Sequence, residues 1–109
     1  MTQAQQSAVD QAVSQLVAAL NPKEIYLFGS CARGDMRSDS DIDLLVVVPD
    51  GSGDPLINTS KAYRATRQLG ISKDIIVDQE SVFEKRSKWT SSIEREVLDT
   101  GKLVYGSRN

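Results

Sequence analysis

The first twenty residues carry apolar side chains at helical spacing. The series follows the i, i+3, i+4, i+7, i+8 pattern, and polar residues such as Gln11 and Gln15 occupy the other side. We therefore predict an amphipathic helix over residues 2–20. Asn21-Pro22 ends it, because a residue that precedes proline is pushed out of the helical region. The apolar positions are Val9, Ala12, Val13, Leu16, Val17 and Leu20.

Two apolar runs follow and predict buried strands. Residues 24–28 form the first run, which ends at Gly29-Ser30, and residues 41–48 form the second. From Ile42 onward the second run is apolar at nearly every position, which is typical of a central strand covered on both faces. Between the two runs, we expect residues 30–34 to form one or two helical turns and residues 35–40 to form a polar loop.

The next segment predicts a helix and then a strand. Asp54-Pro55 combines an N-cap with a first-turn proline, so a helix should begin there and end at Gly70. The side chains expected to share its buried face are Leu56, Ala62, Tyr63, Thr66 and Leu69. Residues 74–78 are short and rich in β-branched side chains, which favours a third strand.

Two helices and an edge strand are expected to close the chain. The spacings Ser81-x-x-Glu84 and Ser91-x-x-Glu94 predict capping boxes, and therefore two short helices, the second ending at Gly101. Residues 103–105 favour an edge strand. The resulting order, α-β-α-β-α-β-α-α-(β), predicts an α/β fold (α+β in some schemes), a small mixed sheet with helices packed on it.

Length, charge and cysteine content narrow the classes of protein. At 109 residues we expect one domain over residues 1–109, without a separate substrate domain. The net charge of -2 lacks the basic excess typical of tight duplex nucleic acid binding. A single cysteine, no leader and no apolar run near 18 residues favour a cytoplasmic protein that does not enter a membrane.

The start of the second strand carries the most informative chemistry. Asp41 and Asp43 lie two residues apart, so in an extended strand they point to the same side, about 6.5–7 Å apart along the backbone. Two desolvated carboxylates are unfavourable unless a cation lies between them. Oxygen ligands without histidine or thiolate select a hard ion such as Mg²⁺ or Mn²⁺, which is commonly shared with substrate phosphates.

The turn after the first strand is a candidate phosphate site. Gly29 lets the backbone approach an anion closely, and Ser30 adds a hydroxyl donor to the N–H groups that open the following helical turn. Arg33 lies in that turn. It can contact a triphosphate, or it can serve as a solvated or ion-paired surface charge.

A third carboxylate completes the candidate site. Asp74 begins the next apolar strand, as Asp41 and Asp43 begin theirs, so a neighbouring strand can bring the three together into a two-metal site. Asp78, at the other end of the same strand, is the competing candidate. We favour Asp74 because Asp78 lies at the end of its strand that leads into the next loop.

The spacing of these residues resembles a known signature. Gly29-Ser30, ten intervening residues and Asp41-Ile42-Asp43 are similar to the Gly-Ser-x10-Asp-x-Asp motif of the polymerase-β-like nucleotidyltransferases. The short length, Ala32-Arg33-Gly34, Ser38-Asp39 and the ending Ser92 to Val97 resemble the minimal nucleotidyltransferase (MNT) family within that group. The likeness runs over residues 5 to 106. It implies a nucleotidyltransferase palm with two Mg²⁺ ions and an NTP substrate.

The resemblance also implies a biological role. Many MNT proteins are antitoxins that silence a HEPN-domain ribonuclease toxin by transferring AMP to it. The expectation is therefore a protein adenylyltransferase of the EC 2.7.7 type, with ATP as the donor. Asp41, Asp43 and Asp74 would be catalytic and metal-binding, and Gly29, Ser30 and Arg33 would bind the nucleotide. The alternative is an antitoxin that inhibits its partner by complex formation alone.

Overall fold

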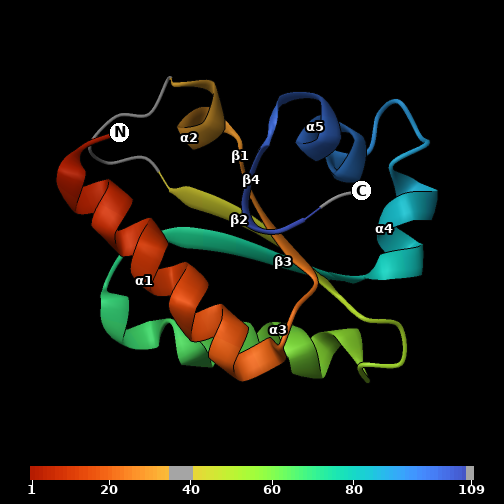
Figure 1. Ribbon diagram of the computed structural model, residues 1–109, viewed down its shortest axis with the longest axis horizontal. Helices are drawn as coiled ribbons and strands as arrows, with labels where there is room; N and C mark the ends of the chain where they lie inside the picture. Colours follow the sequence, from red (N-terminus) through yellow and green to blue (C-terminus); the bar gives the residue numbers. More distant parts are fainter. Residues whose placement is uncertain (35–40, 108–109) are drawn as a thin grey trace.

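The computed structural model describes residues 1–34 and 41–107 and shows one mixed sheet between two layers of helices (Figure 1). The predicted polar loop 35–40 lies outside the described residues. The elements, in chain order, are α1 (Gln3–Leu20), β1 (Glu24–Phe28), α2 (Ser30–Arg33), β2 (Ile42–Val48), α3 (Pro55–Ala65), η1 (Arg67–Leu69), β3 (Lys73–Gln79), α4 (Glu80–Arg86), α5 (Ile93–Thr100) and β4 (Lys102–Gly106).

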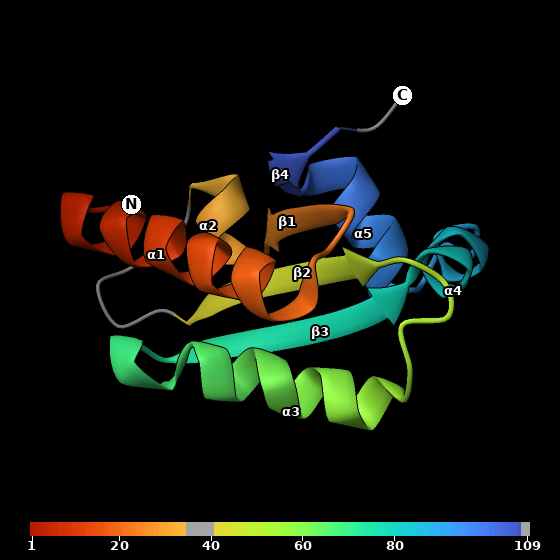
Figure 2. The same ribbon diagram turned by 60° about the horizontal axis from the view of Figure 1, so that its bottom comes forward.

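The four strands lie in the order β3-β2-β1-β4, which Figure 2 shows from bottom to top. β1 is antiparallel to both β2 and β4, whereas β2 and β3 run parallel. The prediction that β2 is a central strand is confirmed, because every residue from Leu44 to Val48 is buried. β4 is the predicted edge strand.

One face of the sheet is covered by α1 and α3. Val9, Ala12 and Leu16 of α1 pack with Leu44 and Val46 of β2 in the larger core cluster. The N-terminal helix is capped by Thr2, whose hydroxyl accepts a hydrogen bond from the Gln5 backbone while the Gln5 side chain accepts one from the Thr2 backbone. The predicted amphipathic helix is thus present, with a capping box at its start.

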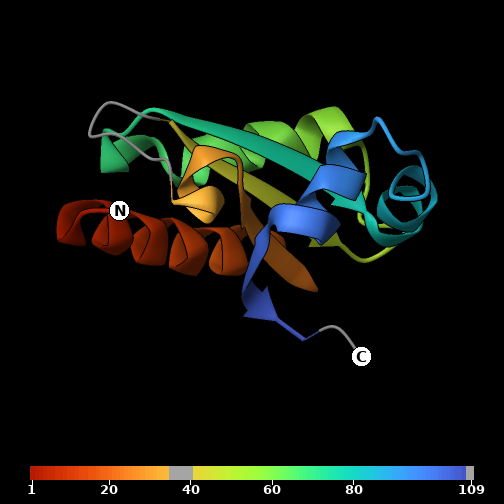
Figure 3. The same ribbon diagram turned by 90° about the horizontal axis from the view of Figure 1, so that it is seen from above.

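The opposite face is covered by α4 and α5. Phe83 of α4 and Val97 of α5 pack against Tyr26, Leu45 and Val47 of the sheet. The Phe83 and Tyr26 rings stack with centroids 5.6 Å apart. Asp43 follows the same alternation as Leu45 and Val47, so it lies on this second face. In Figure 3, which looks from above, α2 and α5 both lie on the near side of the sheet.

Both predicted C-terminal capping boxes are wrong. The N-cap of α4 is Gln79, and the Ser81 backbone instead donates to Asp50 Oδ1 (2.9 Å). The N-cap of α5 is Ser92, whose hydroxyl accepts from the Arg95 backbone (3.0 Å). The strand β3 runs directly into α4 and leaves no room for a cap at Ser81, because the helix has already begun at Glu80.

The predicted buried face of α3 is also partly wrong. Leu56 is 78% exposed, and the residues that turn inward are Asn58, Ala62 and Thr66. The helix ends at Ala65 and continues as η1, which Gly70 closes with a positive φ. Among the described residues, the helices are too short or too polar to cross a bilayer.

Candidate active site

The candidate site lies where β1 ends and β2 begins. Phe28, the last residue of β1, pairs with Asp43 in the antiparallel register, so Gly29 follows directly beside that carboxylate. A Cβ atom built on Gly29 would collide with Asp43 Oδ2. Gly29 also has a φ of +70°, which L side chains rarely adopt. Both the turn and the close approach to Asp43 therefore require glycine at this position.

Asp74 lies on the other side of Asp43. The parallel register of β2 and β3 pairs Asp43 with Asp74. The same register pairs Asp78 with Val47, at the far end of the sheet from Asp43. Of the two carboxylates that the sequence proposes for the third position, the fold thus places Asp74 next to the Asp-x-Asp pair.

The electrostatic environment of Asp43 identifies its neighbours. Burial raises the pKa of Asp43 above its ordinary value, and the charges of Asp74 and Asp41 raise it further. Glu96 on α5 adds a smaller upward effect, while the Arg33 guanidinium opposes it. Negative charge is therefore concentrated at Asp43, with one cation from α2 within electrostatic reach.

The short helix α2 begins directly after Gly29 and borders the site. Its first residue, Ser30, is half-buried, and Arg33 in its last position is exposed. The buried Cys31 thiol donates to the Asp41 carbonyl with a sulfur–oxygen distance of 3.6 Å, which ties α2 to the start of β2. Burial raises the pKa of the Cys31 thiol, and the Asp43 charge adds to this effect, so the thiol is protonated and unsuited to nucleophilic chemistry.

Sequence reasoning missed Glu96. It lies on α5, more than fifty residues beyond Asp43, and reaches the site only because α5 packs over the sheet through Val97. No local spacing signals such a residue. Its placement depends on the phase of α5 against the strands, which a single sequence does not reveal.

Within residues 1–34 and 41–107, no three His, Cys, Asp or Glu side chains are already arranged to coordinate a metal ion. Asp41 and Asp74 are exposed, whereas Asp43 between them is half-buried. The donors at this edge are nevertheless carboxylate oxygens, the ligand type that suits Mg²⁺. Mg²⁺ is usually held by one or two carboxylates, and water and substrate phosphates complete its coordination. The residues present therefore fit such an ion.

Comparison with known proteins identifies the family of this chain. The family model of the nucleotidyltransferase domain matches residues 8–104 of the chain. The chain belongs to the nucleotidyltransferase domain family. This protein is a nucleotidyltransferase, and the predicted family resemblance and polymerase-β-like fold are confirmed.

Three similar proteins fit this assignment. A "putative protein adenylyltransferase" of Methanocaldococcus jannaschii is 35% identical over 102 residues, which cover 88% of this chain and 97% of that protein. The crystal structure of a toxin–antitoxin with AMP-PNP aligns with a TM-score of 0.61 and 25% identity, covering 89% of this chain and 73% of that one. A mutant of the toxin–antitoxin MntA-HpeT aligns with a TM-score of 0.58 and 23% identity, covering 88% and 72%, and shows the fold alone.

Proposed function

We propose that this nucleotidyltransferase moves AMP from ATP to a hydroxyl group on a partner protein, in a reaction that depends on Mg²⁺. The observation that carries the proposal is the placement of Asp43 between Gly29 on one side and Asp74 on the other. This row of residues gives a phosphate-binding turn, a metal-binding carboxylate and a candidate general base next to one another.

The nucleotide is assigned to the β1 side of the row. The backbone at Gly29 can approach a phosphate because no side chain intervenes, and the Ser30 hydroxyl can donate to the same group. Arg33 is exposed and its charge reaches Asp43, so it can also contact the triphosphate. We assign the β- and γ-phosphates to Gly29 and Ser30.

The metal is assigned to the carboxylates. Asp41 and Asp43 would hold one Mg²⁺ ion together with the triphosphate, and Asp74 would contribute to a second ion. When bound, Mg²⁺ supplies neutralisation of the charge that develops on the phosphoryl oxygens. Burial raises the pKa of Asp43 and the neighbouring negative charges raise it further, and a divalent cation would stabilise the ionised carboxylate in such an environment.

Asp74 is the candidate general base. It is exposed, pairs with Asp43 across the parallel strands, and can therefore reach a hydroxyl that comes from outside. It would accept the proton of the attacking hydroxyl while pyrophosphate leaves on the Gly29 side, since attacking and leaving oxygens lie roughly in line in phosphoryl transfer.

The partner is proposed to be the toxin of a toxin–antitoxin pair, and by the family resemblance a HEPN-domain protein. A relative at 35% identity is named a protein adenylyltransferase, and a structure at 25% identity is a toxin–antitoxin with AMP-PNP. The carboxylates at the site give the docking surface a negative sign without metal, which favours a basic partner segment. A cytoplasmic location stays a prediction.

Mass spectrometry tests the reaction directly. The protein encoded beside this one is incubated with the enzyme, ATP and Mg²⁺, and a mass gain of one or more AMP units is expected. The Asp41→Ala, Asp43→Ala double variant should give no gain. If the double variant still neutralises the partner as well as the wild type does, inhibition by binding alone replaces the enzymatic proposal.

A further inference from the structure

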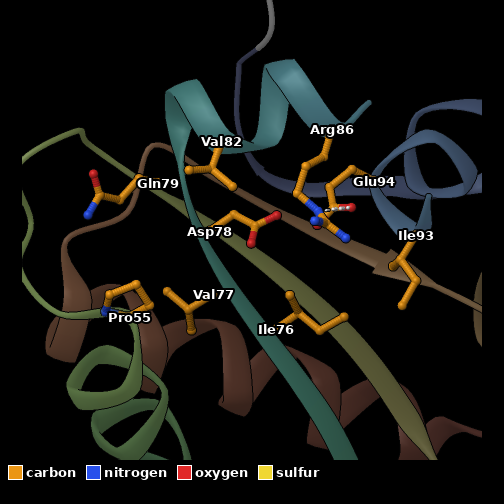
Figure 4. A pocket seen from close by; sticks show the side chains of 9 residues that line it. All are labelled: Pro55, Ile76, Val77, Asp78, Gln79, Val82, Arg86, Ile93 and Glu94. Atoms are coloured by element: carbon orange, nitrogen blue, oxygen red, sulfur yellow. Dashed lines mark hydrogen bonds and ion pairs between the residues drawn. The ribbon is translucent and has the colours of Figure 1, made fainter. Parts of the chain in front are cut away.

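A hollow lies on the same face of the sheet as the candidate active site, at the other end of β3. It has a volume of about 450 Å³, within the range of ligand pockets, and its walls come from β3, α4 and the start of α5 (Figure 4). Ile76, Val82 and Ile93 form apolar walls, and Asp78 points between them toward Arg86 and Glu94.

The polar end of this hollow contains two carboxyl groups and one cation. Glu94 is only 3% exposed and accepts a hydrogen bond from Arg86 Nε at 3.1 Å. Asp78 Oδ2 is buried and finds no donor among the described residues. Glu94 from α5 and Arg86 from α4 are the charged groups that face Asp78, while its β2 neighbour Val47 is apolar.

A buried carboxylate oxygen without a donor can be satisfied in two ways. Asp78 can keep a proton and share it with Glu94, and burial followed by that hydrogen bond raises the pKa of Asp78 to about 7. Alternatively, a ligand can bring its own donor, and Asp78 then releases the proton to solvent. Arg86 already balances Glu94, so the group that suits an ionised Asp78 is a second cation.

The position of the hollow relates it to the acceptor rather than to the nucleotide. Across the sheet, Gly29, Asp43 and Asp74 follow one another from β1 to β3, so a hydroxyl that attacks opposite the leaving pyrophosphate arrives over β3. On the same face of β3, Ile76 separates Asp74 from Asp78. The two aspartates lie about 13 Å apart along the strand, given about 3.3 Å per residue.

We propose that this hollow receives a lysine or arginine side chain from the partner segment that presents the acceptor hydroxyl at Asp74. The apolar walls accommodate the methylene stem of such a side chain, and the Asp78 carboxylate meets its charged head. The assignment rests on the proposed function, because that function supplies the acceptor.

The rim of the hollow suits a protein partner. Val82 and Ile93 are 43% and 46% exposed. Trp89 is 50% exposed, and its ring centroid lies 5.2 Å from the guanidinium of Arg86, which lines the hollow. Exposed aromatic, aliphatic and arginine side chains around a pocket are the residue types that dominate protein–protein binding energy. A polypeptide can cover this rim and fill the hollow at once.

The test uses two synthetic peptides and the whole protein. One peptide carries a tyrosine and, four positions later, a lysine, so that its reach when extended matches the spacing of Asp74 and Asp78. The matched peptide carries norleucine instead of lysine. Binding is followed by the NMR signals of the Ile76, Val82 and Ile93 methyl groups. The lysine peptide should shift them and bind about tenfold more tightly than the norleucine peptide.

Three variants sharpen the test. Asp78→Asn should remove the preference for lysine. The affinity of the wild type for the lysine peptide should rise from about pH 6 to about pH 8 as Asp78 loses its proton, and Asp78→Asn should remove this rise. Val82→Lys, at an exposed wall position, should block the peptide by placing a cation in the hollow. Asp99→Asn removes a carboxylate of α5 that is paired with Arg95 outside the hollow, and it should change nothing.

The outcomes separate this proposal from the proposed function. Equal binding of the two peptides, or no shift at millimolar peptide, would overturn the assignment of the hollow. The assignment would also be overturned if Mg-ATP shifted these methyl signals and Asp78→Asn weakened that shift, because the hollow would then be a nucleotide site. Mg-ATP is titrated separately, and failure of Mg-ATP to stabilise the wild type contradicts the proposed function, whatever the peptides do.

Discussion

Gly29 and Asp43 approach each other so closely that no side chain fits between them. A Cβ atom on Gly29 would collide with Asp43 Oδ2, because the last residue of β1 pairs with Asp43 at the start of β2. The turn that is assigned to phosphate and the carboxylate that is assigned to the metal are thereby fixed to each other by sheet pairing rather than by a flexible loop.

Replacing Gly29 by alanine should therefore damage both stability and nucleotide binding. The backbone of Gly29, with φ +70° and ψ −150°, lies in a region that is essentially open only to glycine, so alanine there should destabilise the fold by about 1–3 kcal/mol. The collision should displace the Asp43 carboxylate in addition. Urea denaturation measures the first effect, and the rise in melting temperature with Mg-ATP measures the second.

Gly34→Ala is the matched control. Gly34 also has a positive φ, +81°, but no atom of the residues that the structure describes lies within 4 Å of a Cβ atom there. It should lose stability through backbone strain and keep the response to Mg-ATP. If the two variants lose that response equally, the contact between Gly29 and Asp43 is not important for nucleotide binding.

Asp43→Asn should separate the stability of the empty protein from its response to ligand. Removing the charge relieves repulsion from Asp74, Asp41 and Glu96, so the ligand-free protein should melt at a higher temperature than the wild type. The same change removes a metal ligand, so Mg-ATP should stabilise the variant much less. Differential scanning fluorimetry with and without Mg-ATP checks both, and an unchanged Mg-ATP response would count against the proposed metal site.

Asp74→Asn should separate binding from chemistry. The amide keeps the shape of the side chain but cannot accept a proton, so Mg-ATP binding should stay near that of the wild type. AMP transfer should fall by at least about 10²-fold, the lower range for loss of a general base. Calorimetric titration measures Mg-ATP binding, and a transfer assay measures the rate of AMP transfer. Asp78→Asn, on the same strand, should lower transfer only by weakening the binding of the acceptor segment. If Asp74→Asn keeps transfer and Asp78→Asn abolishes it, Asp78 is the third catalytic carboxylate.

The Asp78–Glu94 pair predicts a pH dependence of stability. The pKa of Asp78 is raised from 3.8 to about 7 in the folded state, by burial and by the hydrogen bond to Glu94. Between these values the folded protein holds a proton that the unfolded chain has released. The contribution of Asp78 to the free energy of unfolding therefore falls as pH rises from about 4 to about 7.

The Asp78→Asn variant tests this sign. The amide stays neutral at every pH, so the variant should gain stability over the wild type at about pH 8, and the gain should shrink toward about pH 5. Burial works against ionisation of Glu94, but hydrogen bonds with Asp78 and Arg86 hold the pKa of Glu94 below its ordinary value, so its own contribution is lost only under acid conditions. Denaturant midpoints across this pH range are the measurement, and a constant difference between variant and wild type would contradict the shared-proton pair.

The order and type of the elements could be predicted from the sequence because they depend on local pattern. Helical periodicity located α1, and continuous hydrophobicity located β2 as a central strand. The buried face of each helix and the residues at which it begins and ends were less predictable. Leu56 turns to solvent where Asn58 turns inward, because the sheet surface that α3 meets decides which helical face is buried. The cap of α5 is Ser92 rather than Ser91 for the same reason, because the packing of α5 against the sheet decides that the helix begins at Ile93.

The sequence by itself determined the turn Gly29-Ser30 and the pair Asp41 and Asp43, because both are short spacings within one segment. Only the tertiary structure decided that Asp74 rather than Asp78 lies beside Asp43, since that depends on the register between two strands thirty residues apart. It also brought Glu96 toward the site, and Glu94 to Asp78. Side-chain periodicity describes one element at a time, whereas strand register and helix phase arise from burial of the whole core, so contacts between distant elements emerge only when the chain is packed.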